Sequence, residues 1–342
     1  MTASRKETPA ARGVSRGIKL VVGLLVSVIF LYATLATVPF GEVLAALSSA
    51  KPEWIAASLG GIALAYLLKI YRWATMLRSL GARVRMVDAA VPLMGSVAFN
   101  NMLPFRAGDI IRVVAFQRFT GVPPSAQLGT LMLERLLDLF VLMGLLFATM
   151  SFWQTNVLDE ALLSGARMAA FAVAVAILLF IAAPRPIQLL VNWADGRFPK
   201  LAPAGGALMR LSTAISTLSN PLLLLRLSGI SIAAWLAEGG AFFAVGQSLG
   251  VAATVEAALL ALCVGTLSTV IPSSPGYVGT FHYFTSRVAS GFGGGSVGAA
   301  AYAILIHALL WLSTTATGFL LMALSGFGQK RPIAAPSSGA KN

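Results

Sequence analysis

Charged residues and cysteine are scarce in this chain of 342 residues. Asp, Glu, Lys and Arg make up 11% of it, hydrophobic residues make up 57%, and the mean hydropathy is +0.83. So few charges could not cover the surface of a soluble domain of this size. The single cysteine, Cys263, excludes an internal disulfide and a cysteine-based metal site. The composition predicts an all-α polytopic integral membrane protein.

Acidic residues are also scarce relative to basic ones: 12 against 25, which gives a formal charge of +13. Such an excess can indicate nucleic-acid binding, but most of the basic residues lie between apolar segments and not along one polar face. Lysine and arginine in the short loops of a membrane protein mark its cytoplasmic side. We therefore expect no nucleic-acid partner, and we place both termini in the cytoplasm.

Six apolar segments approach the roughly 20 residues that a helix needs to cross a bilayer. We expect these spans at about residues 20–38, 54–70, 127–152, 168–183, 222–245 and 297–324. The length of the first segment and its poor cleavage site favour an uncleaved span over a signal peptide. We expect a basic cytoplasmic N-terminus at 1–17, one membrane domain at 18–325, an amphipathic cytoplasmic connection within it at 184–221, and a disordered tail at 326–342.

A long apolar region is interrupted at residues 100–112, which read Asn-Asn-Met-Leu-Pro-Phe-Arg-Ala-Gly-Asp-Ile-Ile-Arg. The apolar run before it, 89–103, is too short to cross the bilayer. Polar side chains and irregular backbone at bilayer depth must be buried in protein or line a cavity. We expect a re-entrant hairpin that enters from the cytoplasm, breaks here and returns. Its candidate substrate-binding residues are Asn100, Asn101, Pro104, Arg106, Gly108, Asp109 and Arg112.

A second interruption follows residues 256–271, where Pro272 and Gly276 repeat the spacing of Pro104 and Gly108. Broken segments at matching positions in two halves are typical of inverted-repeat transporters, which bind their substrate between the repeats. We expect repeats at about 18–153 and 166–325, each with three spans and one re-entrant hairpin. The candidate binding residues of the second hairpin are Ser273, Ser274, Pro275, Gly276, Gly279 and His282.

Three charged residues, Glu134, Arg135 and Asp138, lie within the third apolar span. Buried charges are costly unless they are paired, so we expect an ion network that ties this span to Asp109 and Arg112 of the first hairpin. The sequence is compatible with a network that gates transport and with one that only holds the fold.

Several candidates have a structural alternative. Arg106 and Arg112 suit a lipid phosphate because the planar guanidinium matches phosphate geometry. The alternative is ordinary cytoplasmic charge, which we prefer for Arg118. Asp109 could also cap the helix that follows it. His307 is expected to pack within its span, and two histidines so far apart in the sequence do not indicate a metal site.

Three motifs resemble those of one family: Asn100-x-x-x-Pro104-x-Arg106-x-Gly108-Asp109-x-x-Arg112, Glu134-Arg135-x-x-Asp138 and Pro272-x-Ser274-Pro275-Gly276-x-x-Gly279. Together they resemble the membrane region of the lysylphosphatidylglycerol synthase transmembrane, or flippase-like, family over about residues 17–324. The resemblance implies a bacterial inner-membrane protein that moves a lipid between leaflets. It gives no support for lipid aminoacylation, because the synthases' soluble aminoacyl-transferase domain has no room here. Many members carry a glutamate a few residues after the second Pro-Gly motif, where this chain has His282, so a role of that acid in transport is either missing here or has passed to the histidine.

Two classes of function fit these residues. The first is a flippase or transporter for a phosphate-bearing lipid, either a phospholipid or a polyprenyl-phosphate-linked lipid, with membrane lipids as partners and no cofactor. The second is a membrane-embedded transferase with Asp109, Glu134 or Asp138 as general base or metal ligand; a non-catalytic partner of a lipid-synthesis enzyme is a further alternative. The sequence has no nucleotide-binding loop, nucleophile elbow or Cys/His metal motif. We therefore expect a transporter rather than an enzyme.

Overall fold

The computed structural model describes residues 25–34, 36, 38–153, 160–195, 197–271 and 273–326. These residues form α-helices and short 3₁₀ turns and contain no strand, so the predicted all-α fold is confirmed for this part of the chain. The helices and turns are Leu25–Thr34, α2 (Phe40–Ser48), α3 (Pro52–Ser79), α4 (Met86–Met102), η1 (Pro104–Arg106), α5 (Ala107–Ala115), α6 (Gln117–Thr120), α7 (Pro124–Trp153), α8 (Glu160–Ala182), α9 (Pro184–Ala194), η2 (Pro199–Leu201), α10 (Ala202–Leu218), α11 (Pro221–Leu249), α12 (Val255–Ser268), η3 (Pro275–Tyr277), α13 (Thr280–Gly291) and α14 (Gly295–Leu324).

Five helices in the described residues are long and apolar enough to cross a membrane: α3, α7, Leu163–Ala182 of α8, α11 and α14. They correspond to the second to sixth predicted spans. Large apolar side chains such as Leu67, Phe140 and Phe171 remain exposed on them, as expected of helices that face lipid. Only part of the first predicted span is described; the predicted segment 1–17 and all of the predicted tail 326–342 except residue 326 lie outside the described residues.

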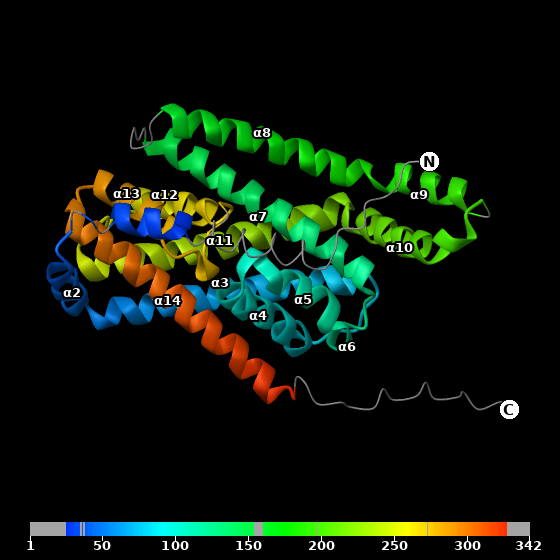
Figure 1. Ribbon diagram of the computed structural model, residues 1–342, viewed down its shortest axis with the longest axis horizontal. Helices are drawn as coiled ribbons and strands as arrows, with labels where there is room; N and C mark the ends of the chain where they lie inside the picture. The colour runs from blue at the N-terminus through cyan, green and yellow to red at the C-terminus, as the bar shows by residue number, and fades with distance from the viewer. Residues whose placement is uncertain are drawn as a thin grey trace.

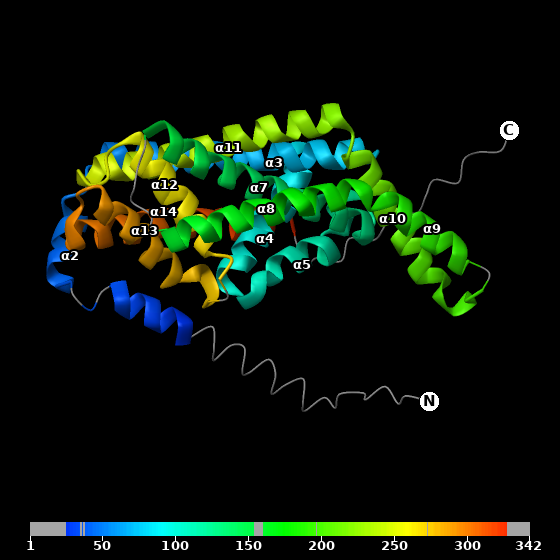
Figure 2. The same cartoon turned by 90° about the horizontal axis from the view of Figure 1, so that it is seen from above.

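The helices α3, α7, α8 and α11 run roughly along the long axis of the molecule, and α14 crosses at an angle (Figure 1). Within this bundle α3 packs against α11, α4 against α14, and α12 against α7. The connection predicted at 184–221 contains α9 and α10, which extend beyond one end of the bundle (Figure 2). The apolar stripe of α10 contacts protein, because Ile215 and Leu218 are buried in a core that α3, α4 and α7 share.

The first hairpin consists of α4, η1 and α5. Phe105 and Arg106 have φ angles of 59° and 51°, in the left-handed region that side chains disfavour. At Gly108, α5 crosses back over α4 so closely that a Cβ would approach the carbonyl oxygen of Ser96 to 2.0 Å. The break that the sequence predicts at residues 100–109 lies between Met102 and Ala107.

The second hairpin consists of α12, η3 and α13. Its turn has the same form as the first, since Gly276 and Tyr277 have φ angles of 71° and 59° after Pro275. The sequence comparison paired Pro104 with Pro272, which lies outside the described residues. The turn itself begins three residues later, at Pro275.

The helix Leu25–Thr34 packs against the turn of the second hairpin. A Cβ at Gly279 would approach the carbonyl oxygen of Ser27 to 2.2 Å, and the hydroxyl of Ser27 accepts from the backbone N–H of Ser274 at 2.7 Å. The ring of Phe30 lies 5.2 Å from that of Tyr283. This turn is therefore partly covered by another segment of the chain.

Candidate functional site

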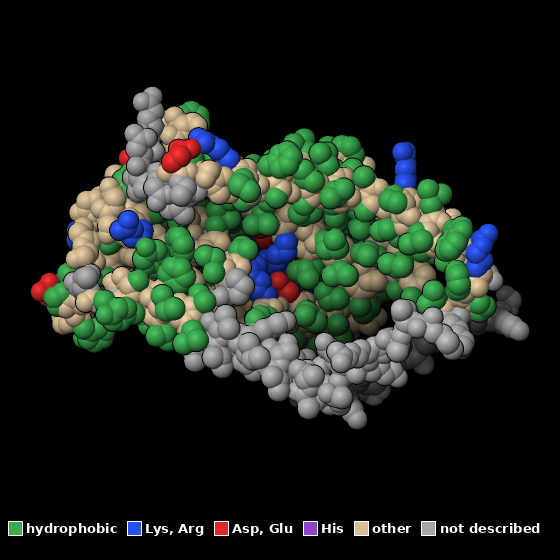
Figure 3. Space-filling view, turned by 45° about the horizontal axis from the view of Figure 1, so that its top comes forward, with side chains coloured by type: hydrophobic (Ala, Val, Ile, Leu, Met, Phe, Trp, Pro, Cys, Tyr) green, Lys and Arg blue, Asp and Glu red, His purple; other side chains and the backbone are tan. Residues whose placement is uncertain are grey.

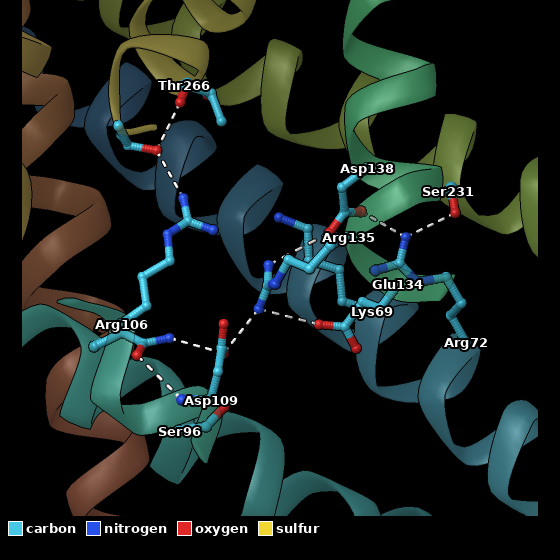
Figure 4. Close-up of polar contacts among 12 residues, drawn as sticks. Lys69, Arg72, Ser96, Arg106, Asp109, Glu134, Arg135, Asp138, Ser231 and Thr266 are labelled. Carbon is cyan, nitrogen blue, oxygen red and sulfur yellow. Dashed lines mark hydrogen bonds and ion pairs between the residues drawn. The ribbon is translucent and has the colours of Figure 1, made fainter. Parts of the chain in front are cut away.

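A cavity of about 540 Å³ lies among α3, α4, α5, α7, α11 and α12. Its wall includes five basic and four acidic side chains, an unusual concentration in a chain with 11% charged residues. Figure 4 shows several of them converging from different helices, with Arg135 at the centre. The charged residues of the wall are Lys69, Arg72, Arg106, Asp109, Arg112, Glu134, Arg135, Asp138 and Glu238.

The cavity lies near the middle of the long apolar helices. Lys69, Asp138 and Glu238 are close to the central residues of α3, α7 and α11. In Figure 3, basic and acidic side chains gather in a hollow in the middle of a largely apolar face. Charged side chains at this depth are costly unless they are paired, so their presence here marks a candidate functional site.

Arg112 and Glu134 form a bidentate ion pair at the wall of the cavity. The Nη1 and Nη2 atoms of Arg112 donate to the two carboxylate oxygens of Glu134 at 3.1 and 3.0 Å. Both side chains are buried, and the guanidinium lies 5.0 Å from the ring centre of Trp73. Parallel hydrogen bonds of this kind fix orientation, so Arg112 joins α5 to α7 rigidly.

Asp109 joins the first hairpin to the same span. Its carboxylate accepts from Nη2 of Arg135 at 2.9 Å and from Nδ2 of Asn100 at 3.0 Å. The backbone N–H of Asp109 donates to Oδ1 of Asn100 at 3.2 Å. The prediction that Asp109 caps a helix is wrong, because the left-handed Arg106 lets α5 begin at Ala107 and places Asp109 within its first turn.

Asp138 accepts from two long helices. Nη1 of Arg72 on α3 donates to it at 2.6 Å, and the indole N–H of Trp235 on α11 donates at 3.2 Å. Arg135 lies 3.6 Å away on the same helix. The predicted span ends at residue 70, which places Arg72 in the cytoplasmic loop that follows, but α3 continues to Ser79 and buries this arginine. The carboxylate of Asp138 offsets the cost of burial, which the local sequence of α3 could not show.

Lys69 and Glu238 form a pair that the sequence did not predict. Nζ of Lys69 lies 2.5 Å from the carboxylate of Glu238, 4.0 Å from the ring centre of Trp235 and 4.8 Å from that of Tyr66. An ammonium over aromatic faces gains cation–π stabilisation. Each residue is a lone charge inside an apolar span, which is the signal that could have found them.

Arg106 is the cation of this cavity that lacks a carboxylate partner among the described residues. Its guanidinium donates to the hydroxyl of Thr269 at 3.0 Å and lies 5.7 Å from the ring centre of Tyr277. It also lines a second cavity of about 280 Å³ between the two hairpin turns. The predicted site residues that line this second cavity with it are Asn100, Pro104, Ser273, Ser274, Pro275 and Gly276.

Other predicted site residues hold the hairpins in place and line neither cavity. Asn101 donates from Nδ2 to the hydroxyls of Thr314 and Thr315 on α14 at 3.1 and 2.8 Å. His282 accepts from the backbone N–H of Gly279 at 3.3 Å. Gly108 and Gly279 act through the close approaches of their backbones.

The two histidines lie together although they are distant in sequence. Their ring centres are 4.6 Å apart, and Nε2 of His307 is 2.8 Å from the carbonyl oxygen of Gly276. Within the part of the chain that the structure describes, no three His, Cys, Asp or Glu side chains gather as metal ligands would. The pair instead supports the turn of the second hairpin.

Comparison with known proteins agrees with this arrangement of apolar helices. Residues 20–318 match the family described as the lysylphosphatidylglycerol synthase TM region. One curated relative is the glycosyltransferase AglD of Haloferax volcanii, 28% identical over 132 residues, which are 39% of this chain and 21% of the relative. The chain thus matches about a fifth of that relative's length. Because the family match covers most of its residues, the chain belongs to the lysylphosphatidylglycerol synthase TM region family.

Proposed function

We propose that this protein is a lipid flippase or transporter that moves a phosphate-bearing lipid between the leaflets of the bacterial inner membrane. The observation that carries the proposal is the position of Arg106. It lines both the charged cavity and the smaller cavity between the hairpin turns, and among the described residues no carboxylate neutralises it. A guanidinium without a carboxylate partner suits a phosphate headgroup, which it can hold with two parallel hydrogen bonds.

The charge of the cavity also favours an anionic ligand. Its five basic and four acidic residues leave one positive charge in excess. The side chain of Arg135, which bridges Asp109, Glu134 and Asp138, is 36% exposed, and its Nε has no hydrogen-bond partner among the described residues. Because Arg135 lines the cavity, the exposed part of its side chain is available to a phosphate oxygen, whereas its Nε atom is buried.

The packing of the helices supports an inverted repeat with two re-entrant hairpins. If α3, α4 and α7 correspond to α11, α12 and α14, the pair α4–α14 becomes the pair α12–α7, and both pairs are in contact. The pair α3–α11 corresponds to itself. If α2 also corresponds to α10, the pair α2–α14 becomes the pair α10–α7, and both of these pairs are in contact. A pseudo-two-fold axis would then pass between α3 and α11, beside the charged cavity, where such transporters bind their substrates.

The surface around the hollow suits a substrate with a polar head and an apolar tail. Large apolar side chains cover the face that contains it (Figure 3). A lipid could place its headgroup in the cavity and leave its chains in the bilayer. The headgroup would then avoid most of the cost of crossing hydrocarbon, because the paired charges of the wall replace its hydration.

The orientation follows from the basic residues of the connecting segments. Arg83, Arg118, Arg197 and Arg210 lie in segments that we place on the cytoplasmic side, together with both termini. The first hairpin then enters from the cytoplasm and the second from the periplasm.

The relative named as a glycosyltransferase favours a second candidate, a transferase that acts on a lipid phosphate. In that case Asp109, Glu134 or Asp138 would be the general base or a metal ligand. All three carboxylates are already held by arginines. Such pairing stabilises the carboxylate and weakens it as a base, so the cavity suits binding better than proton abstraction.

A leaflet-resolved assay tests the proposal. The purified protein is placed in phosphatidylcholine liposomes with a fluorescent phosphatidylglycerol or a fluorescent polyprenyl phosphate, and a membrane-impermeant quencher reports the outer leaflet. Movement of at least one of these lipids, faster than in protein-free liposomes, is expected. Chemical modification of the lipid phosphate without any change of leaflet would overturn transport in favour of the transferase.

A further inference from the structure

The pair of Lys69 and Glu238 differs from the other ion pairs of the charged cavity. Asp109, Glu134 and Asp138 are each held by at least one arginine. Among the described residues, Glu238 is bonded to Lys69 alone, at 2.5 Å. Both side chains are mostly buried, with exposed fractions of 13% for Lys69 and 7% for Glu238.

The identity of the cation decides what each pair can do. An arginine does not give up its proton in a protein, so a carboxylate held by arginine keeps a charged neighbour. A lysine is a compact ion on a flexible four-carbon stem, and it can turn to a new partner. If Lys69 leaves, Glu238 is a mostly buried carboxylate without a counter-ion, and a buried charge is costly unless it is paired.

We propose that Lys69 and Glu238 form an exchangeable pair that opens when a dianionic lipid phosphate, a phosphomonoester, enters the cavity. Lys69 turns from Glu238 to the phosphate, which Arg106 also contacts, and Glu238 takes up one proton from water. One O–H bond forms on Glu238, and no covalent bond of the lipid changes. The inference rests on the proposed function, because it concerns the same cavity.

The charge of the cavity explains the choice of a phosphomonoester. The side chains of the cavity wall carry one excess positive charge, so a singly charged phosphodiester restores neutrality without a proton. A doubly charged phosphomonoester leaves one excess negative charge, which a single proton on Glu238 removes. Burying a net charge is expensive, so uptake of that proton accompanies binding of the dianion.

The surroundings of Glu238 leave Lys69 as its direct counter-ion. From α3 it faces Lys69 and Tyr66, and from α7 Arg135 and Asp138 line the same cavity. The residues that α12 adds to the cavity wall, Thr266, Leu267 and the adjoining Val270, carry no charge. On α14, which also packs against α11, the titratable groups Tyr302 and His307 bond to the backbone carbonyls of Phe242 and Gly276.

Isothermal titration calorimetry can measure how many protons the protein takes up when a lipid binds. The protein in phosphatidylcholine nanodiscs is titrated at pH 8 with farnesyl phosphate or with dihexanoyl-phosphatidylglycerol, in two buffers of different ionisation enthalpy. Farnesyl phosphate is dianionic at this pH because the second pKa of a phosphomonoester is about 6. We expect uptake of about one proton for each farnesyl phosphate bound, and none for the phosphodiester.

Three variants assign the proton to Glu238. Glu238→Gln should bind farnesyl phosphate without proton uptake. Because this variant leaves Lys69 buried and unpaired, the double variant Lys69→Gln with Glu238→Gln provides a version without either charge. It should bind farnesyl phosphate about tenfold more weakly, as expected for one lost charge-assisted hydrogen bond. Glu53→Gln, which removes an exposed carboxylate on α3, should retain the proton uptake.

The outcomes separate this inference from the proposed function. Farnesyl phosphate that binds without proton uptake, or with an uptake that persists in Glu238→Gln, would overturn the exchangeable pair and leave lipid binding standing. Equal affinity of the double variant and the parent for farnesyl phosphate would overturn the role of Lys69. Failure of both probes to bind the parent protein would contradict the proposed function as well.

Discussion

The turns of the two hairpins have the same backbone form, but the charged side chains near them differ. Each turn has two consecutive residues in the left-handed region, Phe105 and Arg106 in the first and Gly276 and Tyr277 in the second. The first hairpin carries Arg106, Asp109 and Arg112 within and just after its turn, and all three reach the charged cavity. In the second hairpin the polar groups near the turn are hydroxyls, backbone amides and a histidine.

The polar groups at the two turns differ in the partners that they have within the protein, and this difference suggests different roles for the two hairpins. At the second turn the backbone N–H of Ser274 and the carbonyl oxygen of Gly276 already have protein partners. At the first turn Arg106 has a hydroxyl partner and no described carboxylate. We infer that the first hairpin binds the anion and that the second shapes the opposite wall of the small cavity. The experiments below test this division.

Labelling of single cysteines gives the largest contrast, because each position is either labelled or not. In a chain with the buried Cys263 replaced by alanine, a membrane-impermeant reagent in the periplasm should reach cysteines next to Asp159 and Gly294. It should not reach cysteines next to Arg83, Ala115 and Gly205. Labelling next to Ala115 from the periplasm would rule out a re-entrant first hairpin and the inverted repeat.

Asp138→Asn should cause the largest loss of stability. The substitution leaves Arg72 and Arg135 with less negative charge, and breaking a buried ion pair on one side costs about 3–5 kcal/mol. Thermal unfolding in detergent should therefore begin at a clearly lower temperature. Glu160→Gln, which breaks the exposed pair with Arg167, is the matched control and should change little. Parent-like unfolding of Asp138→Asn would show that the bonds of Asp138 to Arg72 and Trp235 do not hold α7 to α3 and α11.

Gly108→Ala tests the crossing of the two arms of the first hairpin. The new Cβ would approach the carbonyl oxygen of Ser96 to 2.0 Å, so the arms must separate. Overpacking of this kind costs about 1–3 kcal/mol. Gly279→Ala should have a comparable effect in the second hairpin, where the carbonyl oxygen of Ser27 is the neighbour. Gly144→Ala on α7 has no atom within 4 Å of its new Cβ and is the control.

The first arms of the hairpins should show the smallest effects. The guanidinium and the backbone N–H of Arg85 donate to Asp88 and hold the pKa of that carboxyl below its usual value. This contribution is present above the unfolded pKa of about 4 and is lost as the pH falls through the lowered pKa. Because the pair is largely exposed, Asp88→Asn should cost about 0.5 kcal/mol or less at pH 7.

Thr254 caps α12 by accepting from the backbone N–H of Ala257. The substitution Thr254→Ala should cost about 1 kcal/mol at any pH, since a hydroxyl does not titrate. The free energy of unfolding, measured between pH 3 and pH 7, distinguishes the two substitutions: the effect of Asp88→Asn should depend on pH and that of Thr254→Ala should not. A larger loss for Asp88→Asn than for Thr254→Ala at pH 7 would contradict this order.

The apolar segments and the breaks could be predicted from the sequence because local signals specify them. Spans follow from length and hydropathy, and the first break follows from Pro104 and Gly108 within an apolar run. The second break lies where the sequence predicts it, after residue 271, but the spacing paired Pro104 with Pro272, whereas the turn of the same form follows Pro275. Both prolines precede Gly276, and spacing alone cannot choose between them.

The pairs Arg72–Asp138 and Lys69–Glu238 could not be predicted from the local sequence. In each, the partners belong to helices that are far apart in the chain, and which charges meet depends on how α3 packs against α7 and α11. In the sequence, Arg72 also has the position typical of a cytoplasmic basic residue, because it follows Tyr71 at the end of an apolar run.

The central claim, that Arg106 is the phosphate anchor, is tested most directly by lipid movement in Arg106→Lys. This variant keeps the charge but loses the planar fork that binds two phosphate oxygens. We expect it to unfold at nearly the temperature of the parent and to lose most movement of phosphate-bearing lipids in the liposome assay, while the exposed control Arg83→Lys retains it. Movement of every tested phospholipid and polyprenyl phosphate at the parent rate by Arg106→Lys would contradict the claim and leave Arg106 a structural role in the turn.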